Sequence, residues 1–148
     1  MKVYKFGGAS VKDASGVRNL KEIVACAGDD LMVVISAMGK TTNALERVVA
    51  ALAQKDEATA DNEWLAVLDY HVHLAMELGL KPNEDIRFPM MPEYDHTCSY
   101  DQNYDQIVSQ GEILSTQIVA VYLLKSGIRT EWWNMPKLLR TDNTFREA

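Results

Sequence analysis

The segment that most constrains the fold lies near the N-terminus, where a short apolar run ends in two glycines. Residues 3–6 predict a β-strand, Gly7 and Gly8 follow at once, and a helical pattern comes next. Glycines allow a sharp turn and bring backbone N–H groups close to a bound anion, and a helix N-terminus adds further N–H groups. Lys5 places a positive charge beside them. The pattern indicates either a phosphate-binding loop or a plain strand-to-helix turn with an exposed lysine.

The rest of the chain alternates short apolar strands with helices whose apolar residues recur at helical spacing. Residues 31–35 are apolar throughout, which is typical of a strand covered by helices on both faces. Residues 81–100 contain several prolines and no sustained period, which predicts an irregular excursion with one extended piece at 86–88. The predicted elements are strands over residues 3–6, 31–35, 128–133 and 137–141, a turn at Pro136, and helices over residues 16–27 with Ser15 as N-cap, 42–54, 61–78 and 104–125.

This order of elements predicts an α/β fold with a mainly parallel sheet between two layers of helices, a three-layer αβα sandwich. In such sheets, ligands bind beyond the carboxyl ends of the strands. Gly7 and Gly8 follow the first predicted strand, and residues 36–42 follow the second. The two loops are therefore expected to face each other across one crevice.

Other side chains are interpreted as structural. His71 and His73 are two positions apart on a predicted helix and so point to different faces, which argues against a joint metal site. Asp13, Asp29 and Asp30 are interpreted as solvated or capping groups. The residues expected to pack in the interior include Cys26, Trp132 and Trp133, and, on the helix over residues 61–78, Leu65, Leu68, Val72, Ala75 and Met76.

Composition excludes several classes of function. The chain has 148 residues, enough for one domain with a core, and a formal net charge of -6, which argues against a nucleic-acid partner. No run approaches the roughly 20 apolar residues of a membrane helix, and the N-terminus lacks a basic-then-apolar signal pattern. Cys26 and Cys98 fit reduced thiols, so a cytoplasmic protein is expected.

The loop after the second strand resembles a P-loop only in part. Gly39-Lys40-Thr41 would need a glycine five residues earlier, where Val34 stands, so we reject a Walker A motif. Small and hydroxylated residues in this loop could bind a carboxylate, or Thr41 or Thr42 could simply cap the next helix.

Four segments in this chain, taken together, resemble the aspartate kinases. They are Lys5-Phe6-Gly7-Gly8 with the small residues after it, residues 34–43, residues 109–115 around Gly111-Glu112, and residues 132–141. They occur in that family's order and span nearly the whole chain. Two positions depart from the family pattern: Ala9 stands where Ser or Thr is usual, and Asn134 stands where Asp is common.

The resemblance implies the amino-acid kinase fold and a role for each of several residues. Lys5 would supply catalytic positive charge, and Lys5, Gly7, Gly8 and Ser10 would contact the ATP phosphates. Ser36, Thr42 and Glu112 would bind L-aspartate, with Glu112 pairing its ammonium group. From the sequence alone, an ordinary solvated helical position would be favoured for Glu112, and it is the family motif that reverses this preference.

The family resemblance also implies a reaction and its partners. The complete enzyme would transfer the γ-phosphoryl of Mg²⁺–ATP to the side-chain carboxylate of L-aspartate, the first step towards lysine, threonine and methionine. It is expected to be a homo-oligomer with no membrane or nucleic-acid partner. The chain corresponds to the N-terminal portion of the catalytic domain without a regulatory domain, so alone it should be inactive. The alternatives are a kinase of the same fold with another substrate, or a non-catalytic ligand- or partner-binding module.

Overall fold

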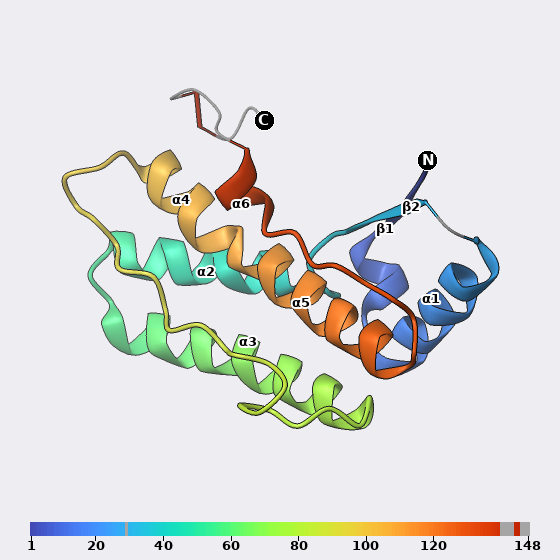
Figure 1. Ribbon diagram of the computed structural model, residues 1–148. Helices are drawn as coiled ribbons and strands as arrows, with labels where there is room; N and C mark the ends of the chain where they lie inside the picture. Colours follow the sequence, from blue (N-terminus) through green and yellow to red (C-terminus); the bar gives the residue numbers. More distant parts are fainter. Residues whose placement is uncertain (29, 140–143, 146–148) are drawn as a thin grey trace.

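A computed structural model describes residues 1–28, 30–139 and 144–145 of the chain (Figure 1). Strands and helices alternate at first and then give way to helices. The elements are β1 (Lys2–Phe6), the 3-10 helix η1 (Gly8–Val11), α1 (Ala14–Cys26), β2 (Leu31–Ile35), α2 (Thr41–Ala53), α3 (Glu57–Glu77), α4 (Tyr100–Val108), α5 (Gln110–Lys125) and α6 (Met135–Leu138).

The sheet consists of β1 and β2, which run parallel in register from Lys2 beside Leu31 to Phe6 beside Ile35. Alternate residues of a strand point to opposite faces. Phe6, Leu31 and Ile35 pack into the core. On the opposite face, Val3 and Val34 are 57% and 43% exposed. The α/β class and the parallel pairing are thus as predicted, and the described residues cover one face of the sheet.

Two apolar clusters form the core. One joins α1 and the end of β2 to the second half of α3 and to α5, and the other joins α2 and the first half of α3 to α4. In Figure 1, α2 and α3 lie side by side and antiparallel, with the α4–α5 run across them. This layered packing fixes the loop after β2 between α3 on one side and α5 on the other.

Several predicted boundaries were wrong, each for a local reason. Asp13, not Ser15, caps α1, because its side chain accepts a hydrogen bond from the N–H of Gly16 at 2.8 Å. Similarly, Asp56 caps α3 and starts it four residues before the predicted position. The helix predicted over residues 104–125 is two helices that meet at Ser109, and the first of them begins at Tyr100.

The apolar face predicted for α3 was only partly right. Ala75 is buried and Leu68 packs against the second cluster, but two other predicted members face solvent. Leu65 and Met76 are exposed. The buried stripe lies one position N-terminal to the predicted one. It includes a tryptophan and a histidine, to which hydropathy scales give low values. It consists of Ala60, Trp64, Val67, His71, Leu74 and Ala75.

The third predicted strand is absent from the described structure. Residues 128–133 run as extended chain along α5 with no strand beside them, and a strand needs such a partner for its backbone groups (Figure 1). Pro136 lies in α6 rather than in a turn, and this helix replaces the start of the strand predicted over residues 137–141. Residues 140 and 141 of that prediction lie outside the described residues.

The remaining segments agree in outline with expectation. Residues 81–99 form an irregular excursion with a single bridge between Pro82 and Ile86. By length and composition, one described stretch, Tyr100–Lys125, would suit a membrane span. Its residues Ile107, Leu114 and Ile118 are fully buried in the two clusters, however, as in the core helix of a globular protein.

Candidate functional site

The loops that follow β1 and β2 contact each other directly, as expected for one crevice. The N–H of Ser36 donates to the carbonyl of Phe6 at 3.1 Å, and the N–H of Gly39 donates to the carbonyl of Gly8 at 3.0 Å. A Cβ on Gly8 would overlap the carbonyl oxygen of Ala37. Gly8 is therefore required by the close approach of the two loops, whatever else it binds.

Gly7 stands in a different environment from Gly8. A Cβ on Gly7 would have nothing within 4 Å, and its φ of -75° is open to any residue. The fold of the described chain thus gives no reason for a glycine at this position. Open space beside a backbone at a strand-to-helix turn is what a close-fitting phosphate would need.

Lys5 and Ser10 lie on either side of these glycines. Lys5 is exposed and is on the sheet face that carries Val3 and Val34. Ser10 lies in η1, and its N–H donates to the carbonyl of Gly7 at 2.9 Å. Within the described part of the chain, neither the Lys5 ammonium nor the Ser10 hydroxyl has a hydrogen-bond or ion-pair partner. Both groups are available to a ligand.

Glu112 reaches the same loop from the other side. It lies in the first turn of α5, where the helix dipole favours a carboxylate, and its Oε1 accepts from the N–H of Ala37 at 3.2 Å. Gly111 makes this approach possible, because a Cβ there would lie 2.9 Å from the Cβ of Ala37. No partner for Oε2 of Glu112 occurs in the described ranges. The carboxylate is thus anchored by one oxygen and open at the other.

Ser36 and Thr42 complete the set of predicted substrate residues. Both residues are half-buried, and their hydroxyls have no partner among the residues described. The interpretation of Thr41 or Thr42 as a helix cap was wrong, because Lys40 occupies the N-cap of α2 without a side-chain bond. The buried Thr41 hydroxyl instead donates to the carbonyl of Met38 at 2.7 Å. The first turn of α2 is left without a side-chain cap, as in sites that receive an anion.

A further structural link runs from Glu112 to the segment after α5. The indole N–H of Trp132 donates to Oγ1 of Thr116 at 3.0 Å, and the Thr116 hydroxyl donates to the carbonyl of Glu112 at 2.7 Å. Trp132 and Trp133 are 37% and 52% exposed, so their assignment to strand and core packing was wrong. Oδ1 of Asn134 is buried, with no partner in the structure as described.

The opposite side of the β2–α2 loop borders an open groove of about 570 Å³ between α2 and α3. Lys12, Lys40, Arg47 and Tyr70 line it, together with Glu63, which takes two hydrogen bonds from Arg47 at 2.8 and 2.9 Å. Sequence analysis did not find this arrangement. No motif marks Tyr70, whose importance depends on how α3 packs.

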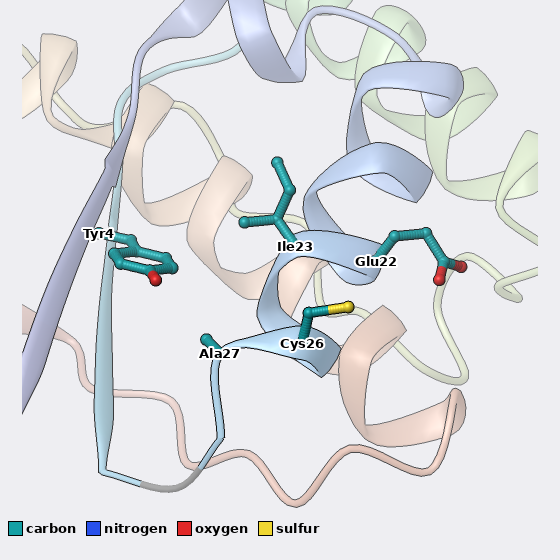
Figure 2. A pocket seen from close by; sticks show the side chains of 5 residues that line it. All are labelled: Tyr4, Glu22, Ile23, Cys26 and Ala27. Carbon is teal, nitrogen blue, oxygen red and sulfur yellow. The ribbon is translucent and has the colours of Figure 1, made fainter.

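The histidines and the thiols lie apart from the crevice. His71 is buried with Nδ1 2.7 Å from the carbonyl of Val67, while the exposed His73 contacts Asp69 at 3.2 Å, so the two do point to different faces. Cys26 is exposed rather than packed inside. It borders a shallow apolar groove of about 410 Å³, where the Tyr4 ring extends from β1 toward Ile23 of α1 and toward Ala27, which directly follows that helix (Figure 2).

Comparison with known families decides where this arrangement belongs. The model of the amino acid kinase family matches residues 1–146, almost the whole chain. The chain belongs to the amino acid kinase family.

Similar proteins within the family are aspartokinases. Lysine-sensitive aspartokinase 3 of Escherichia coli is 28% identical over 154 residues, which cover 99% of this chain and 33% of that protein. The chloroplastic aspartokinase 1 of Arabidopsis thaliana is 28% identical over 148 residues, 89% of this chain and 25% of that protein. The chain therefore spans about a quarter to a third of the length of these relatives.

Solved structures show the same fold. Escherichia coli aspartokinase III in complex with lysine and aspartate superposes with a TM-score of 0.78 at 21% identity, over 98% of this chain and 34% of that one. The same enzyme in complex with aspartate and ADP gives 0.77 at 22% identity, over 98% and 33%. The amino-acid kinase fold predicted from the four segments is confirmed.

Proposed function

We propose that the complete protein containing this chain is an aspartate kinase. It would transfer the γ-phosphoryl of ATP to the side-chain carboxylate of L-aspartate, giving 4-phospho-aspartate and ADP. The similarity to aspartokinases supports this, as does the convergence of Gly8, Ala37 and Glu112 on one loop. That convergence is the observation that carries the proposal, because phosphoryl transfer needs a phosphate-binding loop beside an acceptor-binding group.

The nucleotide would bind at the loop after β1 that begins with Gly7 and Gly8, called the glycine loop below. Gly7 has open space at its Cα, and the Lys5 ammonium has no partner among the described residues. In this proposal the N–H groups of Gly7 and Gly8 and the Ser10 hydroxyl hold phosphate oxygens. Lys5 meets the charge that develops on the transferred phosphoryl group. The side chains described here include no group of carboxylates or imidazoles fit to hold a metal, so Mg²⁺ would be held mainly through the nucleotide phosphates.

Aspartate would bind between α5 and the first turn of α2. The open Oε2 of Glu112 would pair with the substrate ammonium, while the Ser36 and Thr42 hydroxyls would donate to a substrate carboxylate. In the reaction, an oxygen of the side-chain carboxylate forms a bond to the γ-phosphorus. The bond from that phosphorus to the bridging oxygen of ADP breaks, and the electron pair leaves with ADP.

The chain would form the N-terminal portion of the catalytic domain. It covers about a quarter to a third of the length of these relatives, so we expect the isolated chain to be inactive. Coupled ADP release should show aspartate-dependent turnover in the complete protein and none in the 148-residue chain. Turnover by the complete protein with other acceptors but not with aspartate would favour a different kinase of the same fold. Absence of any turnover, with aspartate still bound, would favour a non-catalytic module.

A further inference from the structure

Tyr70 contacts both loops of the candidate site, although it lies on α3 and far from either loop in sequence. Its hydroxyl donates to the carbonyl of Lys12, at the end of the segment that begins with Gly7 and Gly8. The same oxygen lies against Gly39, since a Cβ there would be 3.0 Å from it and 3.7 Å from the ring Cζ. One side chain thus joins the glycine loop to the β2–α2 loop.

Gly39 is the point through which this contact acts. Its φ of +56° favours glycine, and a larger residue would press against the Tyr70 hydroxyl. The N–H of Gly39 donates to the carbonyl of Gly8 at 3.0 Å. A continuous path of contacts therefore runs from Tyr70 through Gly39 to the backbone of Gly8.

The Tyr70 ring is itself fixed in place. It packs against the core cluster of α1, α3 and α5, and it forms an edge-to-face pair with the His71 ring, with the centroids 4.9 Å apart. Burial, and then the negative charge of Asp13, raises the pKa of the Tyr70 hydroxyl. The hydroxyl therefore stays protonated and remains a donor to Lys12 throughout the neutral range.

We propose that Tyr70 is a positioning residue, which holds the glycine loop and residues 36–40 at the spacing that phosphoryl transfer requires. It touches none of the groups assigned to ATP or aspartate, so its effect on catalysis passes through Gly39 and Gly8. The catalytic part of this inference rests on the proposed function. The structural part, that Tyr70 restrains both loops, rests on the contacts alone.

Tyr70→Phe in the complete protein tests both parts, because it removes the hydroxyl and keeps the packed ring. Amide hydrogen exchange should become faster in peptides covering residues 7–12 and 36–41. The kcat for aspartate phosphorylation should fall roughly tenfold, about 1.4 kcal/mol in the barrier. Both KM values should change less than about threefold, because misplaced loops weaken the transition state more than they weaken substrate binding.

Tyr104→Phe is the matched control. It also removes a tyrosine hydroxyl bond, to Oε1 of Glu46 at 2.7 Å, but on the α2–α4 side of the molecule. We expect it to leave exchange in both loops and kcat unchanged. If exchange in the two loops were unchanged in Tyr70→Phe, or changed equally in the two variants, the proposal that Tyr70 restrains the loops would be overturned.

Faster exchange with an unaltered kcat would overturn the catalytic role of Tyr70. If the complete protein proved to have no aspartate kinase activity, the proposed function would fail. The exchange comparison would still decide whether Tyr70 restrains the loops.

Discussion

The carboxylate of Glu112 accepts a hydrogen bond from the N–H of Ala37, 75 residues away in the sequence. The bond crosses from the first turn of α5 to the loop after β2 and uses only one carboxylate oxygen. Ala37 also has its carbonyl pressed against Gly8. The acceptor side and the phosphate side of the candidate site therefore meet at the backbone of a single residue.

Glu112→Gln should weaken aspartate binding without unfolding the protein. The amide oxygen of glutamine can still accept from Ala37, but the charge that would pair with the substrate ammonium is lost. Because that ammonium carries the same charge before and during the reaction, we expect a loss of about 2 kcal/mol or more in kcat/KM for aspartate. The KM for ATP should change little.

Steady-state kinetics with each substrate varied in turn measures this, and Glu46→Gln is the control. Glu46 is a helical carboxylate bonded to Tyr104 away from the crevice. If Glu112→Gln changed the kinetic constants for ATP and for aspartate equally, or changed neither, Glu112 would be a structural residue.

Gly7→Ala and Gly8→Ala should separate binding from folding. A methyl group added at Gly7 would meet nothing, whereas one added at Gly8 would overlap the carbonyl oxygen of Ala37. Overpacking of this kind costs roughly 1–3 kcal/mol of stability. We expect Gly7→Ala to keep its thermal midpoint and raise the KM for ATP, and Gly8→Ala to lower the midpoint. A Gly7 variant with normal ATP kinetics would contradict phosphate contact at that position.

Much of this site was accessible from the sequence because its parts follow strands. Gly7, Gly8 and Ser36 lie at the ends of β1 and β2, and parallel strands bring their carboxyl ends to one edge. Glu112 was identified only because residues 109–115 resemble a family motif. Helical spacing alone gave no sign that the first turn of α5 would lie against Ala37.

The incorrect predictions from the sequence have a common physical cause: each concerns a feature that depends on packing against residues distant in the sequence. Residues 128–133 have strand-like composition, but no described strand lies beside them to take their hydrogen bonds. Trp64 and His71 are buried in α3 while Leu65 is exposed, because α2 and α5 decide which side of the helix is covered. Tyr70 carried no sequence signal, since its contacts with Lys12 and Gly39 depend on that same packing.

Lys5→Met should reduce kcat far more than it raises the KM for aspartate. The Lys5 ammonium lacks a partner among the described residues, so its removal breaks no internal bond. It is proposed to meet charge that develops on the transferred phosphoryl, so the loss should fall mainly on the transition state. Single-turnover and steady-state rates of the purified variant measure the split. A normal kcat with a higher KM for ATP would limit Lys5 to ground-state binding.

The stability of the protein should fall as the pH drops below about 6.5, the usual pKa of histidine. Burial lowers the pKa of His71 in the folded state, so in this window the unfolded state binds the extra proton. The loss is limited to about 1.4 kcal/mol per pH unit for one group. It continues until the pH reaches the folded pKa.

Denaturant unfolding between pH 7.5 and 5 should show this slope in wild type and in the exposed-site control His73→Gln. His71→Leu should flatten it, although its stability at neutral pH is also lower because the bond to Val67 is lost. An identical slope in His71→Leu would assign the pH dependence to other groups.

The isolated chain should self-associate through the uncovered face of its sheet. Val3 and Val34 are exposed on that face, and the described residues place no strand beside the second edge of β1. Exposed strand edges and apolar patches favour pairing with another copy. Light scattering over the micromolar range should show a dimer or larger species. Val34→Lys should shift it toward monomer, while Leu65→Lys, at an exposed apolar position on α3, should not. A wild-type chain that stays monomeric at every concentration would show that this face does not drive association.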